Sequence, residues 1–376
     1  MRGLALAIVG LIVSPLAFGA VPNTVTFVPL NQPAAGPVPV SFAIGDFNGD
    51  GKPDLAVVDQ GSATVRVLLG IGNGYFEPWV DYQVGIHPVA IATADFNGDG
   101  RLDLVVASQL SNTVQLLLGN GDGTFRSFTT LEAAGPTALA IGDFNHDGKL
   151  DLAVTNANSN TVAIWLGVGN GIFRPALDFR VGEGPSSIVA GDFNGDGKLD
   201  LAVANQASNN VSILLGTGTG LFEPILTFAA GLTPAWIALG DFNGDGKVDL
   251  AVVNATGSKS YGFKSTVSVL LGNGNGTFQS PLTSSAGSKA SFLLSADFNG
   301  DGKPDLVVAN PGSNNIAILL GFGNGYFLPP LNFTVGQGPA WIGLIDAGQT
   351  GRPDLIVANS LSDTLSVLSN LTAGSR

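Results

Sequence analysis

Short apolar runs alternate with turns rich in Gly, Asn and Asp along almost the whole chain. In one stretch the runs cover 138–141, 152–155, 161–166 and 173–181. Runs rich in Val, Ile, Leu and Phe that are bounded by turn residues are typical of β-strands. Beyond the N-terminal segment no stretch shows a helical period. The pattern predicts an all-β protein.

This four-strand pattern repeats, and a loop of sequence D-F-N-x-D-G-x-x-D-L marks each copy. The intact loops begin at Asp46, Asp95, Asp143, Asp192, Asp241 and Asp297. A degenerate copy, DAGQTGRPDL, begins at Asp346, and a single longer spacing marks an insertion at 257–263. Four strands in a repeat of about 50 residues are typical of propeller blades. The sequence therefore predicts a seven-bladed β-propeller with four-stranded blades.

The two ends of the chain predict how the ring closes. The seventh unit stops after its third strand, 364–368, whereas 24–30 reads as a strand that precedes the first unit. An open ring would leave unpaired sheet edges. We therefore expect the N-terminal strand to complete the last blade, so that 20–376 forms one propeller domain.

The first residues are typical of a secretory signal peptide. Met1-Arg2 precedes an apolar run, 4–18, and small residues such as Ala17 and Gly19 end it. The run is shorter than the roughly 20 residues that a membrane span needs. We predict a signal peptide at 1–19, cleavage after Gly19, and an exported protein, extracellular or periplasmic, without a membrane span. An uncleaved membrane anchor is the alternative.

Each intact loop predicts a metal site. Positions 1, 3, 5 and 9 carry side-chain oxygens, and position 6 is a glycine. Calcium prefers six to eight oxygen ligands, whereas zinc favours Cys and His, of which the chain has none and two. An EF-hand is disfavoured because position 12 is apolar, and a metal-free Asp-Gly turn would explain one loop but not six.

We predict about six bound Ca²⁺ ions. The predicted ligands are Asp46, Asn48, Asp50, Asp54, Asp95, Asn97, Asp99, Asp103, Asp143, Asn145, Asp147, Asp151, Asp192, Asn194, Asp196, Asp200, Asp241, Asn243, Asp245, Asp249, Asp297, Asn299, Asp301 and Asp305. In the seventh loop Gly348 and Thr350 replace Asn and Asp, so weak or no binding is expected there. His146, at position 4 of the third loop, is expected to be a bystander.

The net charge follows from these loops. Three aspartates in each intact loop make up 18 of the 29 acidic residues, and the formal net charge is −13. Six calcium ions would bring the protein close to neutrality, so the acidity does not indicate a basic partner. The low content of Lys and Arg argues against nucleic-acid binding.

The units resemble FG-GAP/VCBS repeats, the calcium-binding blades of integrin α-subunit heads and of many bacterial secreted proteins. The resemblance covers Thr24 to Asn370. It implies that the loops join the first and second strands of each blade on the lower face, and that ligands meet the upper face. Some relatives are lectins and some are enzyme-associated, so the resemblance implies a fold and a metal but little about function.

The sequence contains no recognisable catalytic constellation. It has no G-x-S-x-G, no H-E-x-x-H and no phosphate-binding glycine loop, and its paired carboxylates are assigned to calcium. We therefore predict a non-catalytic binding or adhesion module for an extracellular glycan or protein. A purely structural exported propeller is the alternative. A calcium-dependent polysaccharide-active enzyme is the third hypothesis, with a base among Lys259, Tyr261 and Lys264.

A candidate ligand sector lies five residues before the loops of blades five, six and seven. Trp236, Phe292 and Trp341 occupy this position, whereas the first four blades carry Ser or Ala. Rigid aromatic side chains at a channel mouth could stack on a sugar or a peptide. The alternative is that the three rings fill a wide central channel.

Overall fold

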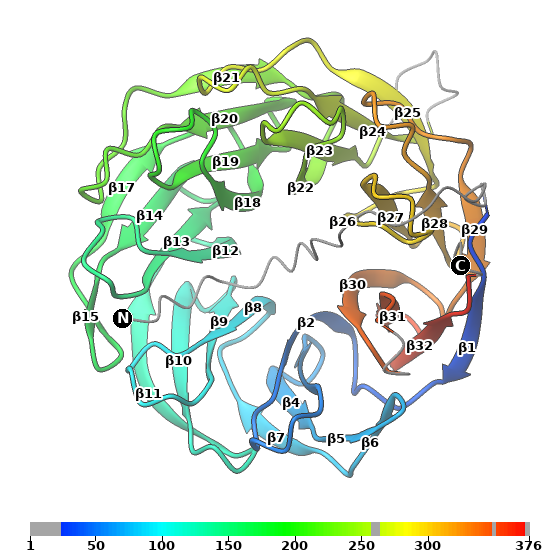
Figure 1. Cartoon of the computed structure of the whole chain (residues 1–376). Helices are drawn as coiled ribbons and strands as arrows, with labels where there is room; N and C mark the ends of the chain where they lie inside the picture. Colours follow the sequence, from blue (N-terminus) through cyan, green and yellow to red (C-terminus); the bar gives the residue numbers. More distant parts are fainter. Residues whose placement is uncertain (1–23, 257–263, 348–350, 373–376) are drawn as a thin grey trace.

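The computed structural model describes residues 24–256, 264–347 and 351–372. Seven four-stranded antiparallel sheets surround a common axis like the blades of a propeller (Figure 1). The predicted seven-bladed, all-β fold is thereby confirmed. In the part of the chain that the structure describes, no helix is long and apolar enough to cross a membrane. The predicted signal peptide, 1–19, and the predicted insertion, 257–263, lie outside the described residues.

In six blades the strands run outward from the axis in sequence order, whereas the outermost strand of the seventh blade comes from the start of the described chain (Figure 1). The innermost strands are β2 (Pro39–Gly45), β8 (Pro88–Ala94), β12 (Pro136–Gly142), β18 (Pro185–Gly191), β22 (Pro234–Gly240), β26 (Phe292–Ala296) and β30 (Pro339–Ile345). The second strands are β3 (Asp54–Asp59), β9 (Asp103–Ser108), β13 (Asp151–Asn156), β19 (Asp200–Asn205), β23 (Asp249–Asn254), β27 (Asp305–Asn310) and β31 (Asp354–Asn359). The third strands are β4 (Thr64–Leu68), β10 (Thr113–Gly119), β14 (Thr161–Trp165), β20 (Asn210–Leu214), β24 (Ser265–Leu270), β28 (Asn315–Leu319) and β32 (Thr364–Asn370).

The outermost strands are β7 (Val80–Gln83), β11 (Phe125–Glu132), β17 (Leu177–Arg180), β21 (Leu226–Ala229), β25 (Leu282–Gly287), β29 (Leu331–Thr334) and β1 (Phe27–Asn31). Two short hairpins precede outer strands, namely β5 (Gly70–Gly72) with β6 (Tyr75–Phe76) and β15 (Gly167–Gly169) with β16 (Ile172–Phe173). Strand β1 is antiparallel to β32, with Phe27 opposite Asn370. The first strand of the described chain therefore completes the seventh blade, which confirms the predicted ring closure.

Each second strand is buried on both faces because a neighbouring blade covers each side. In β3, Leu55 and Val57 pack towards blade 7, whereas Ala56 and Val58 pack towards blade 2. Alternate side chains of a strand point to opposite faces, so these strands read as continuous apolar runs. We call the contact between two consecutive blades a seam.

Six of the seven seams share a phenylalanine contact. The second residue of each intact loop is a buried Phe whose ring meets a Phe of the next blade edge-on or tilted. The pairs are Phe47–Phe125, Phe96–Phe173, Phe144–Phe222, Phe193–Phe278, Phe242–Phe327 and Phe298–Phe27. Aromatic pairs in this geometry add stabilisation beyond their buried area. The loop therefore fixes each blade to its successor.

Candidate metal centres

All six intact loops connect the first strand of a blade to its second strand. This is the connection that the family resemblance implied. We call the face of the ring that carries these loops the lower face. The equivalent loop of blade 7 lies at the same place, although residues 348–350 are outside the described part.

The aspartate at position 1 organises the loop. Asp46 Oδ1 accepts hydrogen bonds from the N–H groups of Gly49 (2.8 Å) and Asp50 (3.0 Å), and its Oδ2 accepts one from Gly51 (2.9 Å). Asn48 Oδ1 accepts a further bond from the Asp50 N–H (3.0 Å). Gly49 and Gly51 have positive φ angles, a conformation that glycine adopts without strain. Most of these bonds recur in the other five loops.

The aspartate at position 9 has a structural role that the sequence analysis missed. Asp54 is 0% exposed, and its two oxygens accept bonds from the N–H groups of Phe47 (2.8 Å) and Gly70 (2.7 Å). The same two bonds occur in all six loops. Gly70 begins the connection between the third and fourth strands. The recurring glycine 16 residues after this aspartate in most blades was the available signal.

Burial gives the position-9 carboxylates an unusual electrostatic environment. The pKa of Asp103, Asp151 and Asp249 is raised to about 6 and that of Asp305 to about 7, mainly by desolvation and to a smaller extent by the aspartates at positions 1 and 5. The two N–H bonds act in the opposite direction. At position 5, by contrast, the N–H of Lys52 and its ammonium lower the pKa of Asp50. Each loop thus concentrates three carboxylates around at most one cationic side chain.

The donor set fits calcium in its chemistry. All four predicted ligand positions offer oxygen, and a carboxylate oxygen that accepts one N–H bond retains a second lone pair. In blade 1 the Lys52 ammonium lies 3.0 Å from Asp50 Oδ2 and would compete with an ion for that oxygen. Among the described residues, no three His, Cys, Asp or Glu side chains converge as a preassembled metal site. Calcium binding therefore remains a prediction that rests on donor chemistry and repetition.

The seventh loop keeps the two outer aspartates of the motif. Asp346 Oδ2 accepts a bond from the Gly351 N–H (3.0 Å), as in the intact loops. Asp354 is buried, and its Oδ1 accepts bonds from the Asn370 N–H (2.7 Å) and the Ser369 hydroxyl (3.2 Å). In the seventh loop, therefore, the aspartate at position 9 still binds the end of the third strand, although the predicted metal ligands at positions 3 and 5 are lost.

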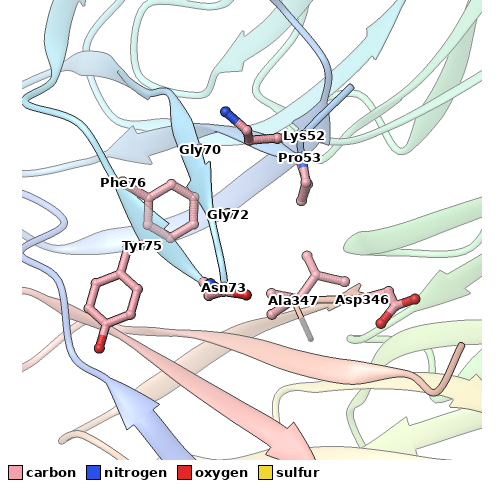
Figure 2. Close-up of a pocket in the computed structure, with 11 residues that line it drawn as sticks. Lys52, Pro53, Gly70, Gly72, Asn73, Tyr75, Phe76, Asp346 and Ala347 are labelled. Carbon is pink, nitrogen blue, oxygen red and sulfur yellow. The ribbon is translucent and has the colours of Figure 1, made fainter. Parts of the chain in front are cut away.

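The seam between blades 7 and 1 contains a small cavity of about 30 Å³. Ala347 stands where the six intact loops have Phe, and Figure 2 shows it opposite the hairpin that carries Asn73 and Phe76. Asp346 and Lys52 line the same cavity. A space of this size holds one or two water molecules. It is too small for a sugar or an aromatic ligand.

The predicted aromatic sector is a compact cluster. Trp236, Phe292 and Trp341 come from three adjacent inner strands, and their ring centroids lie 4.4–4.9 Å apart. Phe292 is 4% exposed, whereas both indoles are partly exposed and pack against the apolar cores of blades 5 to 7. The three residues lie near the end of the inner strands that faces away from the loops.

The remaining candidate residues are distributed over the surface. His146 is exposed and has a positive φ angle at a loop position where the other five intact copies have glycine. Lys264 is exposed, whereas Lys259 and Tyr261 lie outside the described residues.

Fold and loops together define the class of this protein, a seven-bladed β-propeller with an acidic loop in each blade. Within this class, the chain belongs to the FG-GAP-like repeat family, whose profile matches residues 46–106, 95–154, 143–203, 192–252, 255–306 and 297–357. A comparison with curated proteins found no match.

Solved structures with similar folds have diverse activities. The N-terminal part of BBS1, solved in complex with ARL6, has a TM-score of 0.66 at 13% identity over 93% of this chain and 98% of that one. A lectin of Agrocybe aegerita that recognises non-reducing terminal N-acetylglucosamine gives 0.52 at 20% identity over 83% and 81%. A periplasmic gluconolactonase of Pseudomonas aeruginosa gives 0.62 at 16% identity over 82% and 88%. At these identities the similarity extends to the fold alone.

Proposed function

We propose that this protein is an exported, calcium-stabilised propeller that acts as a non-catalytic binding module for an extracellular glycan or protein. The observation that carries the proposal is the sixfold recurrence of one oxygen-only donor set. Metal-free turns would not need three aspartates in each loop. Negative charge concentrated around few cations favours a bound divalent ion.

Calcium would act through the connections of each loop. The side chains at positions 1, 3, 5 and 9 would hold the ion, which would supply the positive charge that the loop lacks. Position 9 is bonded to the strand connection of its own blade, and the Phe at position 2 packs on the next blade. Rigidity of the loop would therefore stabilise both the blade and the seam.

Binding is favoured over catalysis by the way the acidic groups are used. The aspartates of the intact loops are hydrogen-bonded within their loops, which leaves them poorly placed for proton transfer to a substrate. Related folds include a lectin and lactonases, so the fold itself accommodates both roles. The two partly exposed indoles of the aromatic cluster are the first candidate contact in this proposal.

A glycan array probed with and without EGTA tests the proposal. We expect EGTA to lower the melting temperature strongly and to abolish ligand binding. If the aromatic cluster is the contact, Trp236→Ala and Trp341→Ala should weaken binding by protein that is still folded, although the lost packing lowers its melting temperature. Absence of binding to any glycan or extracellular protein, with a large calcium effect on melting, would instead support a purely structural propeller.

Export is tested independently of the ligand. The protein recovered from the periplasm or the medium should begin at Ala20, because the predicted cleavage follows Gly19. N-terminal sequencing of the recovered protein gives this directly. A chain that keeps Met1 and sediments with membranes would contradict export by a cleaved signal peptide.

A further inference from the structure

Blade 1 departs from the other blades at the end of its second strand. The last residue of each second strand is a buried polar residue that faces a seam. In the other six blades this residue is neutral: Ser108, Asn156, Asn205, Asn254, Asn310 and Asn359. Blade 1 instead has Asp59, which is 0% exposed. Neither of its carboxylate oxygens accepts a hydrogen bond from a described residue. A buried carboxylate without hydrogen bonds is costly to the fold.

A second substitution in the same blade accompanies Asp59. Arg66 lies opposite Val57 in the neighbouring strand and is 8% exposed. The residues at the corresponding position of the other blades are uncharged, namely Gln115, Ala163, Ser212, Ser268, Ala317 and Ser366. Arg66 Nε lies 3.5 Å from Asp59 Oδ2. The two unusual residues therefore form one buried pair of an acid and a guanidinium.

The guanidinium of Arg66 is held on its outer side as well. Its Nε and Nη2 donate to Asp81 Oδ1 (2.8 Å) and Oδ2 (2.9 Å), a bidentate arrangement that fixes the plane of the group. Its Cζ lies 4.2 Å from the centroid of the Trp79 ring. Stacking of guanidinium on indole is favourable. One face of the indole is thus supported by a rigid, buried group.

Trp79 itself is 45% exposed and directly precedes β7, at the outer edge of the ring (Figure 1). Trp79 and Asp81 both contact the guanidinium of Arg66, so their side chains lie on the same side of the blade. In blade 2 the corresponding aromatic residue is Phe128, which is also exposed, but its cationic neighbour Arg126 lies 5.7 Å away. Among the described residues, a stacked aromatic ring with a buried bidentate support occurs in blade 1 alone.

We propose that Trp79 is a stacking platform for a pyranose ring of a glycan, with Asp81 accepting hydrogen bonds from the sugar hydroxyls. The proposal rests on the binding function proposed above, but it places the ligand at the outer edge of blade 1 instead of at Trp236 and Trp341. The buried pair of Asp59 and Arg66 has no packing advantage over the neutral residues of the other blades. Its effect is to hold one exposed indole and one exposed carboxylate in fixed positions.

The chemistry of the site favours a sugar. A pyranose has an apolar face that matches the open face of the indole, and hydroxyls that need acceptors at its edge. Each Asp81 oxygen keeps a lone pair that Arg66 does not use. Burial raises the pKa of Asp59 to about 8, so at neutral pH the charges of Arg66 and Asp81 balance. A locally balanced site suits an uncharged ligand better than a cationic peptide.

Affinity electrophoresis in native gels that contain soluble xylan, galactomannan, hydroxyethyl cellulose, β-glucan or pullulan tests the platform. The calcium-loaded full chain is compared with Trp79→Ala, Trp79→Phe, Asp81→Asn and the matched control Phe128→Ala. At least one polysaccharide should retard the wild type. Trp79→Ala should weaken that interaction about thirtyfold, as for a tryptophan at the centre of an interface. Trp79→Phe and Phe128→Ala should retain most of it.

The outcomes separate this site from the function on which it rests. If Trp79→Ala leaves retardation by the polysaccharide unchanged and Trp236→Ala removes it, the platform is overturned and the aromatic cluster is supported as the binding site. No retardation of the wild type by any of these polysaccharides would overturn the platform, whereas a positive glycan array would still support the broader function. Binding of a polylysine peptide that salt abolishes, without binding of polysaccharide, would also overturn it. Melting curves of all variants exclude loss of the fold.

Discussion

The six seams with a loop phenylalanine and the seam between blades 7 and 1 differ in what they bury. In the six, a Phe ring from one blade packs on a Phe of the next, as Phe242 does on Phe327. In the seventh, Ala347 leaves a water-sized cavity beside Phe76. The same seam also buries Asp59 and Arg66, where the others bury neutral residues.

This difference shows how a repeat protein distributes its stability. Nearest-neighbour contacts between similar repeats add up to the stability of the ring. A ring with six well-packed seams can tolerate one seam that is polar and incompletely filled. The departures in seam packing lie in blade 1 and its contact with blade 7, and we place the further binding site there.

The largest effect should follow the loss of a Phe from an intact seam. Phe242 is 2% exposed, so Phe242→Ala should lower the free energy of unfolding by about 3–5 kcal/mol through lost contacts and a new cavity. Urea denaturation in saturating calcium measures it. Phe322→Ala, at a residue that is 50% exposed, is the control and should change little. Equal effects of the two substitutions would refute the importance of the seam contact.

A pH-dependent effect should follow Asp59→Asn. The pKa of Asp59 is raised to about 8, mainly by burial and in part by Asp81 and Asp363, while Arg66 acts in the opposite direction. Because this folded-state pKa exceeds the ordinary value near 4, the folded protein binds the proton more tightly. The contribution of Asp59 is therefore most favourable below pH 4 and is lost as the pH rises towards 8, by up to about 1.4 kcal/mol per pH unit.

The comparison of Asp59→Asn with the wild type at each pH isolates this group. The variant should gain stability relative to the wild type between pH 5 and pH 8, because asparagine does not ionise. Urea denaturation at several pH values in saturating calcium measures the difference. A difference that is constant with pH would mean that the ion pair with Arg66 keeps Asp59 charged in the folded protein.

The smallest effect should come from filling the cavity of the seventh seam. Ala347→Val adds two methyl groups beside a space of about 30 Å³, and the gain should be about 0.7 kcal/mol at most. Ala347→Phe exceeds that space and should give no gain, because the hairpin at Asn73 and Gly74 would have to move. Thermal unfolding of both variants beside the wild type decides between them. A large increase in stability with Ala347→Phe would mean that this seam can rearrange to accommodate a phenylalanine, as the other six seams do.

The sequence was sufficient to predict the blades and the ring closure because both follow from local patterns that repeat. Apolar runs and loop motifs recur at a nearly fixed spacing, and the missing outer strand of blade 7 matches the surplus strand before the first loop. Position 9 was harder to interpret. The sequence predicts a metal ligand at Asp54. It does not predict the hydrogen bond from the Gly70 N–H to Asp54, because only the folded blade brings the segment after the first strand next to the segment after the third strand.

The unusual site of blade 1 could not be predicted for a similar reason. Asp59, Arg66 and Asp81 lie on three strands of one sheet, Trp79 directly precedes the third, and each residue is unremarkable by itself in the sequence. Their relation depends on strand register, which places Arg66 opposite Asp81. The aromatic cluster, in contrast, was recognised because its three residues share one position of the repeat.

The direct test of the central claim is the calcium content of the purified protein. Elemental analysis after equilibration with excess calcium and removal of unbound ions by gel filtration should give close to six ions per chain, one for each intact loop and none for the loop at Asp346. Asp245→Ala, in the fifth loop, should reduce the content to about five. A content far below six, or a melting temperature that EGTA leaves unchanged, would contradict the account of these loops as structural calcium sites.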